Sequence, residues 1–143
     1  MPHFALHPRL ASDTVAVGNL PLCSVLLTDD SRYPWLVLVP RRPEAREIVD
    51  LSAEDRAALI EEIAAASRAL RAVTGAEKLN VAAIGNVVAQ LHVHVVARFA
   101  ADAAWPEPVW ARGAAVRYGA GAARERARRI AAELGLVRRN GID

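Results

Sequence analysis

The stretch Gln90-Leu-His92-Val-His94-Val-Val, residues 90–96, carries the strongest structural signal in this 143-residue sequence. Polar and apolar side chains alternate along it, as in a β-strand whose successive side chains point to opposite faces of a sheet. Gln90, His92 and His94 would then share one face, with about 6.6 Å between neighbours on that face. The intervening leucine and valines would pack on the other face. The pattern therefore predicts a half-buried strand with a polar face of unusual composition.

A strand face with two histidines is open to three interpretations. It can be an ordinary polar face that meets water. It can be a pair of ligands to a metal ion, but such a site needs at least a third ligand. The other two histidines, His3 and His7, are expected in a mobile N-terminal region. It can also be a reactive face, because neutral imidazole is a nucleophile and a hydrogen-bond partner near pH 7. No metal is expected, and the first and third interpretations stay open on spacing alone.

The sequence on either side predicts a sheet of about five strands. Short runs rich in valine and leucine, punctuated by proline, glycine and aspartate, are typical of strands. The predicted strands are 14–19, 22–28, 35–39, 79–84 and 89–97. Short links between consecutive strands favour antiparallel pairing. The unbroken apolar character of the third strand suggests that both of its faces are covered.

Two helices complete the predicted fold. Ser52 is a candidate N-cap and Gly75 a candidate C-terminal stop, with apolar residues between them at helical spacing. A second amphipathic helix is expected around Ala123 to Leu134, with most of its arginines on the faces away from the core. The order of elements predicts an α+β fold: one antiparallel sheet with a long helix packed on it, and a C-terminal helix.

These residues together resemble the histidine triad (HIT) family. Residues 90–96 are similar to its signature, His-φ-His-φ-His-φ-φ, where φ is apolar. Leu-Val-Pro at the end of the third strand, the helix that begins near Asp50, and Leu79-Asn80 also match the layout of the family. Trp105-Pro106 is similar to a Trp-Pro of the Hint branch. The resemblance covers about 14–110, and it departs from the pattern at Gln90, which stands where the family has its first histidine.

The resemblance implies a nucleotide site on the histidine face. The family hydrolyses or transfers nucleotidyl groups at the α-phosphate of phosphoramidates, dinucleoside polyphosphates and other nucleotide conjugates. His92 corresponds to the nucleophile, which would form a nucleotidyl-histidine intermediate that water then resolves. Its second nitrogen should donate to a fixed acceptor such as a backbone carbonyl. His94 would hydrogen-bond the phosphoryl oxygens or the bridging atom, and the Gln90 amide could donate to a phosphoryl oxygen.

Further residues take roles only by analogy with the family. Asn80 and Asn86 are expected to contact phosphate or to order the site, although each can equally be a turn or strand-edge asparagine. Asp29, or its neighbour Asp30, is expected on the ribose hydroxyls. Three tryptophans could also contribute: Trp35 by stacking on a base or by packing in the core, and Trp105 and Trp110 by closing the leaving-group side.

Composition limits the wider possibilities. The chain is 53% hydrophobic and 24% charged, which is typical of a folded domain, and its single cysteine excludes a disulfide within the chain. No apolar run approaches the roughly 20 residues that span a bilayer, and no signal peptide is recognised, so a cytoplasmic protein without a membrane segment is expected. The basic character is local: residues 117–143 carry seven arginines against three acidic residues. We expect residues 1–116 to form the nucleotide-binding domain and 117–143 a basic helical extension of it.

The function hypotheses that remain fall into different classes. The first is a metal-independent nucleotide hydrolase or nucleotidyl transferase that needs no cofactor. The second is a nucleotide-binding protein with little or no turnover, for which Gln90 is the main support, since glutamine cannot relay a proton. The third is an interaction module that uses the basic C-terminus, although nucleic acid is not favoured as a partner because no aromatic residues interleave with the arginines. The family resemblance also suggests a homodimer.

Overall fold

The computed structural model describes residues 3–136 of the chain and places five strands in one antiparallel sheet. The strands are β1 (Thr14–Asn19), β2 (Cys23–Thr28), β3 (Trp35–Pro40), β4 (Lys78–Ala82) and β5 (Val93–Arg98). Their order across the sheet is β1-β2-β3-β5-β4, so β5 lies in the interior and β1 and β4 form the two edges. The predicted α+β class and the five-stranded antiparallel sheet are confirmed.

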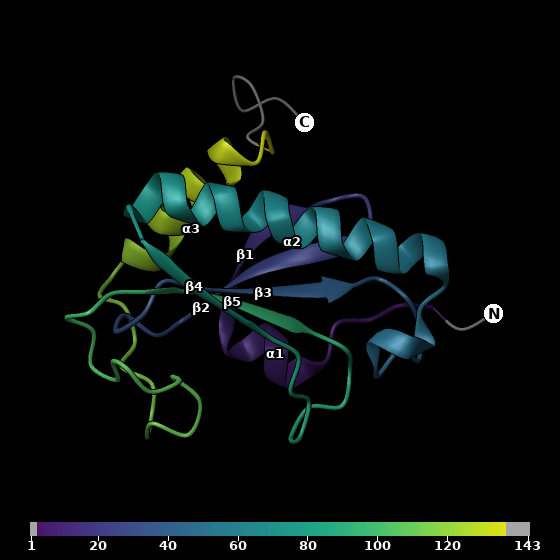
Figure 1. Cartoon of the computed structure of the whole chain (residues 1–143), viewed down its shortest axis with the longest axis horizontal. Coiled ribbons are helices and arrows are strands. Elements are labelled where there is room, and N and C mark those ends of the chain that lie inside the picture. The colour runs from purple at the N-terminus through teal and green to yellow at the C-terminus, as the bar shows by residue number, and fades with distance from the viewer. Residues whose placement is uncertain (1–2, 137–143) are drawn as a thin grey trace.

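The helices cover both faces of this sheet (Figure 1). The helix α2 (Ala53–Thr74) and the helix α3 (Ala122–Glu133) lie on one face, and the short helix α1 (Pro8–Ser12) lies on the other. A single 3₁₀ turn, η1 (Ile48–Asp50), precedes α2. None of the described helices is both long and apolar enough to cross a membrane.

The long helix begins and ends where the sequence predicts. The Ser52 hydroxyl accepts a hydrogen bond from the backbone N–H of Asp55 at 3.1 Å, which satisfies one of the free donors of the first turn. Gly75 ends the helix in the left-handed conformation, with φ of 72°, which a residue without Cβ adopts at little cost. Both signals were local, so the sequence alone was sufficient to place α2.

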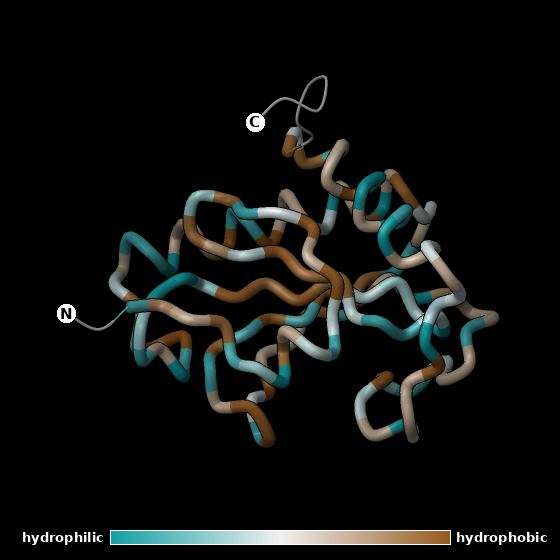
Figure 2. Tube along the Cα trace, turned by 180° about the vertical axis from the view of Figure 1, so that it is seen from behind, coloured by the Kyte–Doolittle hydropathy of each residue, from teal (hydrophilic) through white to brown (hydrophobic). Residues whose placement is uncertain are grey.

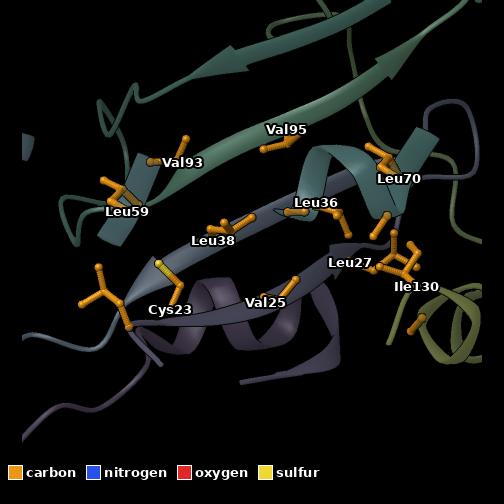
Figure 3. Close-up of a cluster of buried hydrophobic side chains, with 14 of the residues drawn as sticks. Cys23, Val25, Leu27, Leu36, Leu38, Leu59, Leu70, Val93, Val95 and Ile130 are labelled. Carbon is orange, nitrogen blue, oxygen red and sulfur yellow. The ribbon is translucent and has the colours of Figure 1, made fainter. Parts of the chain in front are cut away.

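The main core lies between the sheet and α2 with α3. Figure 3 shows its side chains converging from β2, β3 and β5 on one side and from the two helices on the other. The fully buried members include Val25, Leu36, Leu59, Val95 and Ile130. Figure 2 shows the same central strands as a hydrophobic band between more hydrophilic connections. Since Ile130 of α3 belongs to this core, α3 packs as part of the same folded unit as the sheet.

The second face of the sheet carries a smaller cluster and the histidines. Leu10 of α1 packs there against Leu26, Val37 and Val39, and Phe4 and Leu6 pack on the edge of the same cluster. The N-terminal segment (residues 3–7), expected to be mobile, therefore has apolar contacts with the sheet. The α1 helix was not predicted. Its only signals are His7, whose Nδ1 accepts from the backbone N–H of Arg9, and Pro8 at the first turn.

Two strand boundaries differ from the prediction by more than one residue. The strand predicted over 89–97 begins only at Val93, and the one predicted over 79–84 ends at Ala82. Between them, residues 83–92 form a loop that returns the chain to the sheet (the β4–β5 loop). Gly85 in this loop has a φ of 68°, a left-handed conformation that favours glycine and ends the extended run. The predicted helix around 123–134 is observed, whereas Arg138 and Arg139 lie outside the described residues.

Candidate functional site

His92 and His94 lie at the start of β5 on the face opposite the main core. Leu91, Val93 and Val95 point into that core, so the predicted alternation of side chains holds even though only part of the stretch is strand. Both histidines are buried, with exposed fractions of 6% for His92 and 9% for His94. Their rings approach edge to face, with centroids 4.9 Å apart. Burial of two adjacent imidazoles is unusual for a strand face that meets water, and it indicates a binding or catalytic site.

A cavity of about 540 Å³ opens in front of the two histidines. Its size is in the range of small-molecule sites, and most of its wall is apolar. The apolar wall comes from three segments: α1, β3 and the β4–β5 loop, which contribute Leu10, Trp35, Val37, Ile84, Val87 and Val88. Trp110 and Ala111, from the long segment after β5, complete the wall. The cavity can therefore hold a flat apolar group next to the imidazoles.

The protonation pattern of His92 follows from its hydrogen bond. Its Nδ1 lies 2.7 Å from the backbone oxygen of Gln90. A carbonyl oxygen only accepts, so Nδ1 carries the proton and donates it to this bond. The proton of the neutral ring is thereby assigned, and Nε2 keeps a free lone pair. This is the arrangement that a nucleophilic imidazole needs.

His94 has a different partner. The indole Nε1–H of Trp35 donates to its Nδ1 at 2.9 Å. Burial, and to a lesser degree the neighbouring His92, lowers the pKa of His94 from 6.5 to about 4. His94 is consequently neutral near pH 7. The two tryptophans Trp35 and Trp110 pack edge to face against its ring, with centroids 5.6 Å and 5.4 Å away.

Gln90 does not point its amide at the cavity. Its Oε1 accepts from the backbone N–H of His7 at 2.8 Å, and its Nε2 donates to the backbone oxygen of Ala5 at 2.9 Å. Both ends of the amide are thus engaged by the N-terminal segment, which leads directly into α1 and the cavity wall. The side chain expected on a phosphoryl oxygen instead holds this segment, while its backbone carbonyl binds His92.

The structure separates the other expected site residues. Asn86 is exposed and lines the histidine cavity. Asn80 lies on β4 opposite Val96, where its Oδ1 accepts from Arg98 at 2.7 Å, and it is not among the residues that line the cavity. Asp29 lines an adjoining cavity of about 340 Å³.

The two aspartates after β2 are both engaged by neighbours. The carboxylate of Asp29 accepts from the backbone N–H of Tyr118 at 3.0 Å and from Arg117 at 2.8 Å. Asp30 is buried and binds the Arg32 guanidinium through both oxygens. Burial raises the pKa of Asp30, but the bonds from Arg32 outweigh burial and leave that pKa below its usual value. Neither of these two carboxylates lines the histidine cavity. The two cavities are adjacent, and five residues line both of them: Asp13, Thr28, Trp35, Trp110 and Ala111.

A buried ion pair fixes the segment after β5. Arg98, with an exposed fraction of 2%, binds Asp102 through Nε and Nη2, and also reaches the backbone oxygen of Glu107. Burial opposes the ionisation of Asp102, but the bonds from Arg98 and from three backbone N–H groups lower its pKa to about 2. Trp105 lies over this guanidinium at 5.6 Å rather than in the cavity. The network holds the segment that delivers Trp110 to the site.

The sequence interpretation missed several cavity residues. Arg9 and Leu10 come from the unpredicted α1 and Asp13 directly follows it, whereas Ile84, Val87 and Val88 come from a stretch partly predicted as strand. For Trp35, the sequence predicts base stacking or core packing but not a hydrogen bond to a histidine. Trp35 and His94 meet because they lie on adjacent strands of the sheet, where Trp35 pairs with Val96, and no local pattern in the sequence predicts this contact. Within residues 3–136, no group of three potential histidine, cysteine or carboxylate metal ligands is found.

The fold and the site together define a class: an α+β protein with two buried imidazoles of fixed tautomer at the base of an apolar cavity. Residues 9–101 match the HIT domain, well over half of the sequence, and the chain belongs to this family. No curated protein matches it.

Solved structures of bacterial histidine triad proteins are similar over nearly the whole chain. A histidine triad protein from Bradyrhizobium japonicum is 47% identical with a TM-score of 0.90, covering 93% of this chain and 99% of that one. One from Sinorhizobium meliloti 1021 is 43% identical with a TM-score of 0.88, covering 91% of this chain and 96% of that one. One from Marinobacter aquaeolei VT8 is 42% identical with a TM-score of 0.83, covering 93% and 94%.

Proposed function

We propose that this protein is a nucleotide hydrolase or nucleotidyl transferase that acts at the α-phosphate of nucleotide conjugates. The observation that carries the proposal is the hydrogen bond from His92 Nδ1 to the Gln90 carbonyl, which leaves Nε2 as a free nucleophile beside the cavity. The apolar wall suits a nucleobase, and the shared wall with the adjoining cavity leaves room for a second group. Membership of the HIT family supports nucleotides as the ligand class.

The proposed reaction has two displacements. His92 Nε2 attacks the α-phosphorus, an N–P bond forms, and the bond to the leaving group breaks with its electron pair on the leaving group. Water then attacks the same phosphorus, a P–O bond forms, the N–P bond breaks with its electron pair on Nε2, and the nucleoside monophosphate leaves. The proton lost by the attacking water passes to solvent. An acceptor other than water would give transfer instead of hydrolysis. His94 is placed to hydrogen-bond the phosphoryl oxygens or the bridging atom.

The remaining residues support this site indirectly. The Gln90 side chain holds the N-terminal segment, and its backbone carbonyl sets the tautomer of His92. These two roles replace the phosphate contact expected from the Gln90 side chain. Asn86 lines the histidine cavity, which supports it as the asparagine that would contact phosphate. Asn80 orders Arg98 behind the site. Asp29 lines the adjoining cavity, and each of its oxygens, already bonded to Arg117 or Tyr118, keeps a lone pair that a ribose hydroxyl can use.

The direct test is a substrate panel with matched variants. Purified protein is incubated with adenylyl and guanylyl phosphoramidates and with dinucleoside tetraphosphates, and monophosphate release is followed. His92→Ala should abolish release and the nucleotidyl adduct that intact-mass measurement detects. His3→Ala replaces an exposed histidine outside the cavity and should leave release unchanged. Equal release from the wild type and the His92 variant would contradict the proposal.

A second candidate function is nucleotide binding with little or no turnover. It is favoured by the Gln90 side chain, which cannot relay a proton and whose amide is bonded at both ends to the N-terminal segment. Tight binding of the panel by calorimetry, without release and without an adduct, would support this function and exclude the first. The same measurements thus decide between the two.

We also propose a homodimer formed through α2 and the edge strand β4. Strand β4 has a free edge, because β5 is its only neighbour in the sheet of the described residues. Ile60 on α2 and Val81 on β4 are large apolar side chains with exposed fractions of 62% and 49%. A free strand edge beside exposed apolar residues favours pairing with another chain.

A further inference from the structure

Trp35 makes the only side-chain hydrogen bond recorded to His94 within residues 3–136. An indole N–H is a donor and never an acceptor. The His94 Nδ1 that receives this bond at 2.9 Å must therefore present a lone pair. The neutral ring then carries its proton on Nε2. Trp35 thus determines that Nε2 is the donor nitrogen of His94. The Gln90 carbonyl has the opposite effect on His92, where Nδ1 is the donor nitrogen.

The surroundings of His94 also oppose a second proton. An imidazolium would place an N–H at Nδ1 against the indole N–H, so the bond to Trp35 would be lost. The rings that face His94 are those of His92, Trp35 and Trp110, none of which supplies a negative charge. Arg9 and Asp13 are the charged residues that line the cavity, and both are exposed on or just after α1. Among the described residues, no carboxylate forms a hydrogen bond or an ion pair with His94, and the carboxylate that lines the cavity, that of Asp13, is exposed.

We propose that Trp35 is a positioning residue that fixes His94 as a neutral Nε2–H hydrogen-bond donor, which stabilises charge on the substrate without transferring its proton. This inference rests on the proposed function for its catalytic meaning. A neutral imidazole that gave up the Nε2 proton would become an imidazolate, a strongly basic anion in a buried site. His94 therefore acts electrostatically on the phosphoryl oxygens or the bridging atom, where a preorganised donor is effective.

The inference narrows the substrate class. When the phosphorus–leaving-group bond breaks, the electron pair stays on the leaving group, and His94 supplies no proton to it. Water is the only proton source in the reaction as written. Leaving groups that are stable as anions, such as phosphate, polyphosphate or carboxylate, suit this site. Alkyl amines, which must be protonated to leave, do not. The preferred substrates are thus nucleotidyl anhydrides rather than alkyl phosphoramidates.

The tautomers of His92 and His94 can be determined by NMR without an activity assay. Long-range ¹H–¹⁵N spectra of the uniformly labelled protein at pH 7.5 distinguish protonated from unprotonated ring nitrogens, and a His94→Gln variant assigns the signals among the four histidines. We expect His94 to be protonated on Nε2 alone and His92 on Nδ1 alone. A proton on Nδ1 of His94, or on both nitrogens, would overturn the proposal, and this result needs no variant of Trp35.

Substitution of Trp35 tests its role directly. Trp35→Phe keeps an aromatic ring and removes the N–H, so His94 should lose its single tautomer. Trp110→Phe is the matched control for the spectra, because Trp110 packs on the same ring but its Nε1 has no hydrogen-bond partner among the described residues. An unchanged His94 pattern in Trp35→Phe would refute the proposal.

Kinetics test the consequence for the reaction. We expect kcat/KM to be at least tenfold higher for a dinucleoside polyphosphate than for an alkyl phosphoramidate of the same nucleotide. Trp35→Phe should lower kcat on the anhydride by about 3- to 10-fold, the effect of one hydrogen bond, and a role in packing alone would raise KM instead. His94→Gln, whose amide also donates an N–H, should retain part of the activity.

The pH dependence of kcat distinguishes a neutral His94 that only donates a hydrogen bond from a protonated His94 that acts as a general acid. With His94 neutral throughout, kcat should not fall between pH 7 and 9, whereas loss of a proton-donating imidazolium would make it fall. A falling limb that disappears in His94→Gln would overturn the inference. Absence of turnover on every substrate would refute the proposed function instead, and the ¹⁵N spectra would still decide the role of Trp35.

Discussion

The imidazoles of His92 and His94, with centroids 4.9 Å apart, have opposite tautomers. The Gln90 carbonyl accepts a hydrogen bond from the Nδ1–H of His92, and the Trp35 indole N–H donates one to the Nδ1 of His94. One ring therefore offers a lone pair at Nε2 and the other offers an N–H. Two identical side chains two residues apart thus differ in chemistry because one hydrogen-bond partner is an acceptor and the other a donor.

The buried state of His94 predicts a loss of stability in mild acid. Its pKa is about 4 in the folded chain against 6.5 as the reference, so between these values the unfolded chain binds a proton that the folded chain does not. The free energy of unfolding should therefore fall as the pH falls through this window, by about 3 kcal/mol in total. Urea unfolding between pH 7.5 and 4.5 measures this slope.

The variant His94→Gln provides the control for that slope. Asp30 and Asp102 have lowered pKa values, so their contributions are lost only at the acid end of the window. Between pH 6.5 and 5 the slope should thus depend mainly on His94 and should largely vanish in His94→Gln. If wild type and variant lost stability in parallel there, the burial of His94 would not be the cause.

Gln90→Ala should release the N-terminal segment. The variant removes the acceptor of the His7 N–H and the donor to the Ala5 carbonyl. We expect a loss of about 1–2 kcal/mol in stability, and faster hydrogen exchange at the His7 amide. Asn86→Ala, on the same loop, is the control and should leave that amide unchanged.

A different outcome would restore the expected phosphate role of Gln90. Suppose that Gln90→Ala weakened substrate binding while hydrogen exchange of the His7 backbone N–H stayed as in the wild type. The side-chain amide of Gln90 would then have to leave the N-terminal segment in the complex. Exchange measured with and without a bound nucleotide separates the two cases. Protection that decreases on binding would show this movement.

The sequence predicted the fold through local and periodic signals. Alternation over 90–96, the caps at Ser52 and Gly75, and the short strand links were sufficient for the sheet and α2. The contacts that define the site join residues far apart in the chain, such as Gln90 with His7 and Trp35 with His94. No local pattern encodes such pairs. The short α1 was missed because five residues show little periodicity, and its position depends on packing against the sheet.

The Arg98–Asp102 pair should be important for stability. Both side chains are almost fully buried, and removal of one partner leaves an uncompensated charge. Asp102→Asn or Arg98→Met should lower the free energy of unfolding by about 3–5 kcal/mol. Asn80→Ala, which removes one acceptor from Arg98, should cost about 1–3 kcal/mol. Arg128→Ala breaks an exposed pair with Glu125 on α3 and should cost below about 0.5 kcal/mol.

The same variants test the position of Asn80. It lies outside the histidine cavity, so Asn80→Ala should lower stability with little change in KM below the unfolding temperature. A large increase in KM with unchanged stability would instead support the phosphate contact expected from the family. Thermal unfolding and substrate titration on one protein preparation are sufficient to distinguish these results.

The proposed dimer predicts a specific effect of charge at the β4 edge. Val81→Lys places a charged side chain on an exposed apolar position of this strand and should convert a dimer into a monomer. Val116→Lys is the matched control, because Val116 is exposed to a similar degree, 52% against 49%, but lies on the segment after β5 that binds Ser31. Analytical ultracentrifugation across protein concentrations measures the association.

The expected change in the dimer dissociation constant follows from the surface area that a sheet edge and a helix can bury. A burial of about 800 Å² per partner is common for specific dimers, and one unpaired charge at its centre typically costs several kcal/mol. We therefore expect the dissociation constant to rise by at least about 100-fold in Val81→Lys and to change little in Val116→Lys. Equal dimerisation of both variants would place the interface elsewhere, and a wild-type chain that stays monomeric would refute the dimer itself.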